Sequence, residues 1–386
     1  MAKSYISERV ATLKPSGIRR FFDIAATMKE VISLGIGEPD FNSPQPIIEA
    51  GMRALKEGET HYTGNRGILP LRQALCDKLE RLYGVSYDPA TEVVMTVGGS
   101  EALNIACAAL LDPGDEVLLP TPCFVSYQGV IALAGGVSVE VPSRMENNFM
   151  PDPADLEKAI TPRTKAILIN FPNNPTGAVA DRETLLAIAA LAEKHDLVVI
   201  SDEIYDRLVY GFEHVCFPAL PGMRERTILI GGFSKDYAMT GWRIGFACAP
   251  AHLMDGLAKV HQFIIMTAPT MAQFGALEGL TCCEDFVEHM RVEYDRRRRL
   301  IVEGLNYIGL PTFEPKGAFY AFPKVSVTGL SDEEFAERLL QEKHVAVVPG
   351  SAFGPGGDGF VRCSYATAFD QIEEALDRID QFVKTL

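Results

Sequence analysis

The sequence predicts an α/β fold: a mostly parallel sheet of about seven strands with flanking helices, followed by a smaller α+β unit. Short apolar runs that end in turn residues and lack clean alternation are typical of strands buried on both faces. Helical stretches lie between these runs, and alternating strands and helices favour a parallel sheet covered by helices. The runs are EVVMTVG (92–98), DEVLLP (115–120), GVSVEVP (136–142), TKAILIN (164–170), LVVISDE (197–203), TILIGG (227–232) and IGFACAP (244–250).

The first helical stretches belong to this larger unit. One covers 100–111, and another covers 181–196 and opens on Asp181, a residue suited to cap a helix N-terminus. We therefore predict a large domain over 45–283. It is preceded by an N-terminal segment, 1–44, that partly joins the smaller domain.

The character of the sequence changes after residue 283, where the small C-terminal domain, 284–386, is predicted. A long charged helix is expected first, and a later helix begins with the capping box Ser331 and Glu334. The expected elements are helices at 284–305, 331–340 and 370–386, and strands at 317–323, 344–350 and 359–366.

Charge and composition exclude several classes of protein. The chain has 51 acidic and 36 basic residues, a net charge of −15, which disfavours nucleic acid and anionic membranes as partners. Its apolar runs are too short to span a membrane. Eight cysteines are scattered without a C-x-x-C motif, so we expect a cytoplasmic protein without disulfides or structural zinc.

Polar residues gather where three of the expected strands end. Asn174 follows the run 164–170, Asp202 and Tyr205 follow the next run, and Ser234 and Lys235 follow TILIGG. Ligands of open α/β sheets bind beyond the carboxyl ends of the strands. Singly, each residue has an ordinary structural reading as a cap, a turn or a surface side chain. Together they indicate one cleft.

This set of residues suits pyridoxal 5′-phosphate. A lysine amine such as that of Lys235 forms an imine with the aldehyde once burial has lowered its pKa. Asp202 is the expected partner of the ring nitrogen, Asn174 and Tyr205 of the 3-oxygen, and Phe124 is expected to stack on the ring. The turn into the helix at VGGSEAL (97–103) is a candidate phosphate site, completed by Arg243 and the hydroxyls of Ser100 and Ser234.

These motifs closely resemble the fold-type I pyridoxal-phosphate aminotransferases of class I/II, the group that contains aspartate and aromatic aminotransferases. The resemblance covers nearly the whole chain. It rests on SLGIGEPDF (33–41), HYTGNRGILPLR (61–72), NNPTG (173–177), DEIY (202–205), GFSKDYAMTGWRIG (232–245) and VRCSYA (361–366). Segments 15–25 and 348–354 are most similar to archaeal-type aromatic or broad-specificity members.

The resemblance implies a role for each matching position. Lys235 would form the internal aldimine, Asp202 would face the pyridine nitrogen, and Arg362 would hold the substrate carboxylate with Asn174 and the Gly37 backbone. Gly99, Ser100, Ser234 and Arg243 would lie near the phosphate. Tyr62 would reach the phosphate of the other subunit, which implies a homodimer with shared active sites.

Two positions depart from the family pattern. Gly232 stands where many relatives have a serine near the phosphate. Ser100 and Glu101 stand where some bacterial aspartate aminotransferases place a lysine for a substrate side-chain carboxylate. Arg66, Arg19 and Arg20 are candidate replacements. The donor is therefore expected to be aromatic, aspartate or broad in class.

The expected reaction is ping-pong transfer of an amino group from an L-amino acid to 2-oxoglutarate. A β-lyase or related carbanion reaction is the alternative, because it would use the same cofactor residues. A regulator with an aminotransferase-like domain is disfavoured, since about 30 residues before SLGIGEPDF leave no room for a DNA-binding domain. A nucleotide-dependent oxidoreductase lacks its G-x-G-x-x-G motif here.

Overall fold

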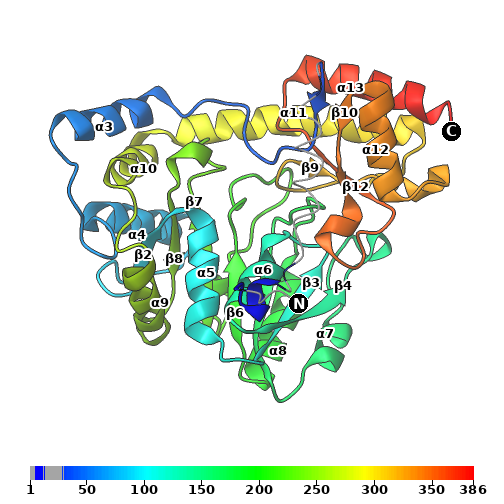
Figure 1. Cartoon of the computed structure of the whole chain (residues 1–386). Coiled ribbons are helices and arrows are strands. Elements are labelled where there is room, and N and C mark those ends of the chain that lie inside the picture. The colour runs from blue at the N-terminus through cyan, green and yellow to red at the C-terminus, as the bar shows by residue number, and fades with distance from the viewer. Residues whose placement is uncertain (1–4, 12, 14–27, 29) are drawn as a thin grey trace.

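The computed structural model describes residues 5–11, 13, 28 and 30–386 (Figure 1). Its centre is a sheet of seven strands, as the seven apolar runs predict. The strand order in the sheet is β2-β8-β7-β6-β5-β3-β4. The strands are β2 (Val93–Thr96), β3 (Glu116–Thr121), β4 (Val137–Pro142), β5 (Thr164–Asn170), β6 (Val198–Asp202), β7 (Thr227–Gly232) and β8 (Gly245–Cys248).

The sheet is mostly parallel, and only β8 runs antiparallel to its neighbours β7 and β2. A parallel connection needs a crossover of a dozen or more residues, usually through a helix. Between Gly232 and Gly245 the chain forms only turns and the short 3₁₀ helix Thr240–Trp242. Because no α-helix carries the chain back across the sheet, β8 runs beside β7 in the opposite direction.

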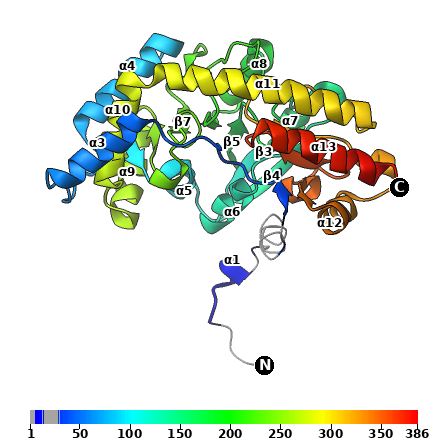
Figure 2. The same ribbon diagram turned by 90° about the horizontal axis from the view of Figure 1, so that it is seen from above.

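Helices cover both faces of this sheet (Figures 1 and 2). Alternate strand residues pack to opposite sides: Val117 and Leu168 face α5, α6 and α9, whereas Leu118 and Ile169 face α7 and α8. Helices α4 and α10 pack on the side of β2, β7 and β8. The helices are α3 (Gln45–Lys56), α4 (Leu69–Tyr83), α5 (Gly98–Leu110), α6 (Ser126–Leu133), α7 (Pro153–Ala159), α8 (Arg182–Lys194), α9 (Ala251–Ile264) and α10 (Thr270–Cys282).

The smaller unit is built on α11 (Glu284–Ile308), which lies beside α13 (Phe369–Val383) in both views. Helix α12 (Asp332–Lys343) begins with the predicted capping box, and Asp181 caps α8 as predicted. The small strands are β9 (Tyr320–Ala321), β10 (Val345–Ala346), β11 (Val348–Pro349) and β12 (Val361–Ser364). Near the N-terminus, α1 covers Glu8–Ala11.

The N-terminal segment connects the two units. Strand β1 (Ile32–Ser33) pairs in parallel with β10 of the smaller unit. Farther along, Ser43 accepts a hydrogen bond of 3.0 Å from Nε1 of Trp242, whose ring lies against Gly51 of α3 and Gly275 of α10. The domain limits at 44/45 and 283/284 stay a prediction. In the described part of the chain, no helix is long and apolar enough to cross a membrane.

Candidate active site

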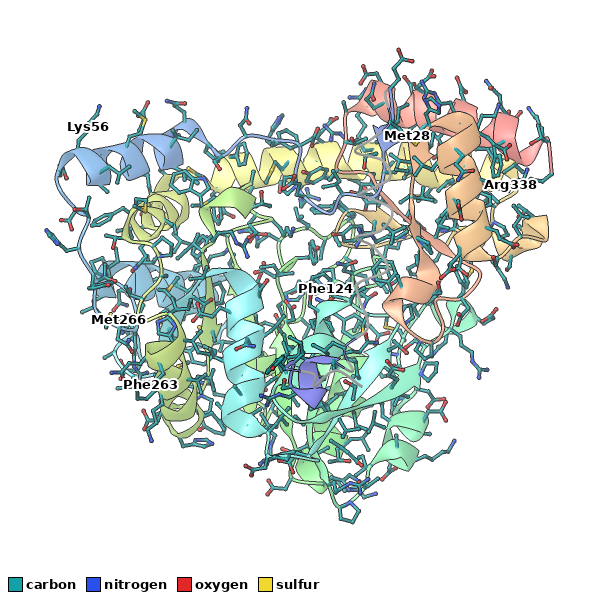
Figure 3. All side chains as sticks on the ribbon, in the orientation of Figure 1. Met28, Lys56, Phe124, Phe263, Met266 and Arg338 are labelled. Carbon is teal, nitrogen blue, oxygen red and sulfur yellow. The ribbon has the colours of Figure 1, made fainter. Side chains whose placement is uncertain are left out.

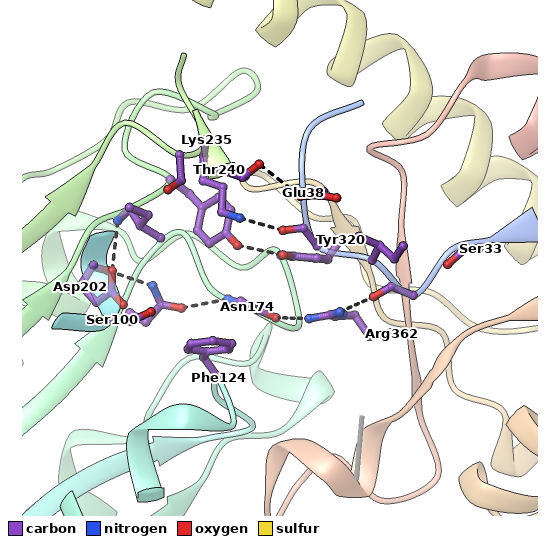
Figure 4. A pocket seen from close by; sticks show the side chains of 18 of the residues that line it. Ser33, Glu38, Ser100, Phe124, Asn174, Asp202, Lys235, Thr240, Tyr320 and Arg362 are labelled. Carbon is purple, nitrogen blue, oxygen red and sulfur yellow. Dashed lines mark hydrogen bonds between the residues drawn. The ribbon is translucent and has the colours of Figure 1, made fainter. Parts of the chain in front are cut away.

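A cavity of about 1120 Å³ lies at the carboxyl ends of β5, β6 and β7, beneath the N-terminal segment. Its lining includes Gly37, Gly99, Ser100, Phe124, Asn174, Asp202, Tyr205, Ser234, Lys235, Arg243 and Arg362. Of the residues predicted to hold the cofactor or the substrate carboxylate, only Tyr62 is missing from this lining. Figure 4 shows Asp202 and Arg362 toward opposite ends, with Lys235 and Asn174 between them.

Lys235 is positioned by the turn that follows β7. Its Nζ donates a hydrogen bond of 2.7 Å to the carbonyl oxygen of Gly37, so the amine points into the cavity (Figure 4). Burial lowers the pKa of Lys235 to about 8; Glu38 opposes this shift, and Arg362 and Arg243 add to it. About a tenth of the amine is therefore neutral at pH 7, far more than for an ordinary lysine, and the neutral form is the one a nucleophile requires.

Asp202 ends β6 next to Asn170 of β5. Burial raises the pKa of Asp202 to about 6, while two donors oppose the shift. They are the Tyr127 hydroxyl, 2.7 Å from Oδ2, and the backbone N–H of Ile204, 3.2 Å from Oδ1. These bonds favour the charged carboxylate, so Asp202 can face a cationic ring nitrogen at neutral pH.

Tyr205 is joined to Tyr320 of β9, with 2.8 Å between the two hydroxyl oxygens. Tyr320 also explains why residue 37 is glycine, because a Cβ there would lie 2.4 Å from the Tyr320 hydroxyl oxygen. Tyr320 and Tyr127 line the cavity although sequence reasoning singled out neither. Tyr127 lies three residues after the predicted Phe124, but nothing in the sequence indicates that its hydroxyl reaches Asp202.

Arg362 on β12 is a buried cation whose guanidinium donates hydrogen bonds to two neutral oxygens. Its Nη1 donates to Oδ1 of Asn174 at 2.9 Å, and its Nη2 donates to the Gly35 carbonyl at 2.6 Å. Its Nε is buried and has no hydrogen-bond partner among the described residues. Because buried donors are nearly always satisfied, this guanidinium is suited to an incoming carboxylate, which it can bind through two parallel bonds.

The opposite end of the cavity is suited to an anion. Helix α5 begins at Gly98, and its first turn carries Gly99 and Ser100. Gly98 has φ +70°, and a Cβ there would lie 2.8 Å from Nη2 of Arg243. The free N–H groups of a helix N-terminus and an adjacent guanidinium together attract a phosphate.

The remaining predicted residues lie elsewhere. The side chain of Tyr62 is 80% exposed and outside the cavity of its own chain. Arg66 does not line this cavity either; it forms an ion pair of 3.2 Å with Asp255 and donates to the Thr91 carbonyl. Arg19 and Arg20, with all of segment 15–25, lie outside the described residues.

Comparison with known proteins agrees with this geometry. Residues 29–379 match the family described as aminotransferase class I and II. The chain is 48% identical to the aspartate aminotransferase of Pyrococcus abyssi and 46% identical to aromatic-amino-acid aminotransferase 2 of Thermococcus litoralis, with 98% of each chain covered in both cases. The crystal structure of the aromatic aminotransferase from Pyrococcus horikoshii superposes with a TM-score of 0.91 at 46% identity, over 95% of this chain and 99% of that one. With matches of this extent, the chain belongs to the class I and II aminotransferases and is an enzyme of the transaminase type.

Proposed function

We propose that the protein is a pyridoxal-phosphate-dependent aminotransferase that transfers the amino group of an L-amino acid to 2-oxoglutarate in a ping-pong reaction. The observation that carries the proposal is the convergence of Lys235, Asp202 and Arg362 on one cavity. Class I and II aminotransferases are in general dependent on this cofactor, which supports the same conclusion.

The residues present fit the cofactor at each of its polar groups. The start of α5 and Arg243 suit the phosphate, and Asp202 suits the ring nitrogen. Tyr205 and Asn174 supply polar atoms for the 3-oxygen, while Phe124 offers an aromatic face. We infer that these residues hold the group and that Lys235 attaches to it.

When bound, the cofactor supplies an aldehyde for the amino group and a ring that delocalises charge from the substrate carbon. The protein contributes position and proton transfer. Arg362 binds the substrate α-carboxylate, which directs the Cα hydrogen toward Lys235. Nζ of Lys235, once the incoming amino group has displaced it from the cofactor, would take the Cα proton and deliver it to the cofactor carbon that carried the aldehyde, a type of catalysis that typically contributes about 10²–10⁴-fold to the rate.

The donor class stays a proposal with three members: aromatic, aspartate or broad. Relatives named for aspartate and for aromatic amino acids are similar to this chain to nearly the same extent. A panel of donors, each followed by the spectral change of the bound cofactor, separates the three.

We also propose a homodimer with shared active sites. The side chains of Tyr62 and Phe263 are 80% and 88% exposed, and Met266 is half exposed, an unusual density of apolar surface. Figure 3 shows Phe263 and Met266 on the side of the molecule away from the smaller unit. A second copy that covers this side would bring its Tyr62 toward the phosphate end of the cavity.

Replacement of Lys235 by alanine tests the assignment. Lys235→Ala is expected to abolish glutamate formation from 2-oxoglutarate, because no other amine replaces Nζ, and to remove the absorbance of lysine-attached cofactor. The matched control is Lys259→Ala, which removes an exposed lysine of α9. Normal turnover by Lys235→Ala would refute the proposal. Pyruvate and ammonia from a β-substituted donor, without glutamate, would support a lyase instead.

A further inference from the structure

A buried acid–base pair lies beside the site but has no role in the reaction proposed above. Glu101 in the first turn of α5 is 8% exposed, and His261 on α9 is fully buried. His261 Nδ1 and Glu101 Oε1 are 2.6 Å apart. Buried charged groups are costly unless paired, so a pair placed here calls for a specific explanation.

The second nitrogen of His261 indicates the charge of the pair. Nε2 is 2.8 Å from the carbonyl oxygen of Asn65, which can only accept a hydrogen bond. The other carboxylate oxygen of Glu101 accepts from the backbone N–H of Val97, the residue before α5. Because the other carboxylate oxygen already accepts an N–H bond, the arrangement suits an imidazolium that donates from both nitrogens, to an anionic Glu101 and to the Asn65 carbonyl.

The position of this pair matters for anion binding. Glu101 follows directly after Gly99 and Ser100, which line the phosphate end of the cavity. An uncompensated carboxylate in this helical turn would repel a phosphate that the N–H groups of the turn attract. The positive charge of His261 cancels that repulsion without occupying the cavity.

The hydrogen bond between His261 and the Asn65 carbonyl also links Glu101 of α5 to the loop that carries Tyr62. The loop is also held by Thr267, whose hydroxyl oxygen is 2.6 Å from that of Thr63, and by Thr270, which donates to the His61 carbonyl at 2.8 Å. Thus Thr267 and Thr270 fix the residues on both sides of Tyr62, and His261 joins the same loop to α5 through its hydrogen bonds to Asn65 and Glu101.

We propose that His261 is a positioning residue with two effects. It neutralises Glu101 beside the first turn of α5, where the phosphate is proposed to bind, and it couples this turn to the loop whose Tyr62 is proposed to reach the second subunit. The proposal rests on the proposed function, because it needs phosphate at α5 and Tyr62 across the dimer. Cofactor binding and subunit association should then depend on the same buried pair.

The electrostatic part is tested by the affinity of the cofactor-free protein for pyridoxal phosphate and for pyridoxal, which lacks the phosphate. His261→Gln keeps one donor for Glu101 but removes the positive charge. It should weaken pyridoxal phosphate binding roughly three- to tenfold and pyridoxal binding much less. In Glu101→Gln/His261→Gln both charges are absent, and the preference for the phosphorylated compound should return. The control is His252→Gln, an exposed residue of the same helix.

Equal losses for both compounds, or no recovery in the double variant, would overturn the electrostatic part. If the unaltered protein itself binds pyridoxal as tightly as pyridoxal phosphate, the proposed function fails instead, so the two failures are distinguishable.

The coupling to the loop is tested by sedimentation of the cofactor-free protein at a series of concentrations. His261→Gln should raise the dimer dissociation constant several-fold, and addition of pyridoxal phosphate should tighten the dimer less than in the unaltered protein. An unchanged dissociation constant with an unchanged response to the cofactor would overturn the coupling.

Discussion

At the scale of single residues, Lys235 and Asp202 have pKa values displaced in opposite directions by the same cause. Burial disfavours the charged form of each, so the pKa of the amine falls to about 8 and that of the carboxyl rises to about 6. Between these values Asp202 is anionic while part of Lys235 is neutral. We therefore expect the cofactor-free site to be best prepared between about pH 6 and 8.

Tyr127→Phe should shift the acid side of this range. The Tyr127 hydroxyl donates to Asp202 and lowers its pKa, so its loss should raise that pKa further. Because the ring nitrogen needs the carboxylate form, cofactor affinity should begin to fall at a higher pH, by up to about one unit. Measurement of the cofactor dissociation constant from pH 5 to 8 checks this, with exposed Tyr307→Phe as control. If affinity began to fall at the same pH in Tyr127→Phe and in the unaltered protein, the prediction would be wrong.

The extent to which the sequence predicts the site depends on how each residue acts. Lys235 and Arg362 act through chemistry that their type and motif reveal. Tyr320 and Tyr127 act through contacts that span 115 and 75 positions of the chain, and such contacts exist only once the strands are arranged. The Gly35 carbonyl, which holds Arg362, belongs to the backbone and has no sequence signal at all.

At the scale of elements, the seven strands were predictable from apolar runs, but their directions were not. The antiparallel course of β8 goes with the absence of an α-helix between β7 and β8, which the apolar runs do not encode. The site segments after β6 and β7 share a further pattern. Each functional side chain is followed by an acidic one that does not line the cavity: Asp202 by Glu203, Tyr205 by Asp206, and Lys235 by Asp236. Glu203 and Asp236 are buried, and Asp206 is partly buried.

Asp236→Asn should make stability less dependent on pH. Oδ2 of Asp236 pairs with Lys78 at 3.4 Å, whereas Oδ1 is buried with no hydrogen-bond partner in the part of the chain that the structure describes. Burial together with Asp206 raises the pKa of Asp236 to about 7, against the pull of Lys78 and Arg207. Since this pKa lies above the unfolded value of 3.8, folding loses stability as pH rises from about 4 to about 7. The variant avoids that loss and should be more stable above pH 7, by on the order of 2 kcal/mol.

Urea unfolding of the cofactor-free protein at pH 5 and pH 8.5 measures this difference, with exposed Asp377→Asn of α13 as control. A variant that is destabilised equally at both pH values would show that Asp236 is needed as an anion.

At the scale of the whole molecule, the N-terminal segment joins the two units around the cavity. It pairs with β10, supplies the Gly35 carbonyl to Arg362 and the Gly37 carbonyl to Lys235, and Glu38 accepts a bond of 3.1 Å from Thr240. The segment thus contacts both Arg362, expected to bind the substrate carboxylate, and Lys235, expected to take the Cα proton. The exposed apolar side with Tyr62 and Phe263 lies on the larger unit, where the second subunit is proposed to bind.

Mixed dimers test whether the sites are shared. Lys235→Ala should be inactive, and Tyr62→Ala should be weakened through poorer cofactor binding. A dimer with one subunit of each kind contains one site with both residues intact, if Tyr62 serves the partner. Co-expression with two different affinity tags should therefore yield mixed dimers with far more activity than either parent dimer at limiting cofactor. Mixed dimers no more active than Tyr62→Ala would show that Tyr62 acts within its own chain.

Trp242 gives the protein an intrinsic optical probe. It is the only tryptophan of the chain, and its indole lies where Ser43, α3 and α10 meet, seven positions after Lys235. Ultraviolet emission from the unlabelled protein therefore comes from one fluorophore at the base of the N-terminal segment. The emission wavelength would report whether water reaches this junction. Quenching of the emission would follow cofactor binding in real time.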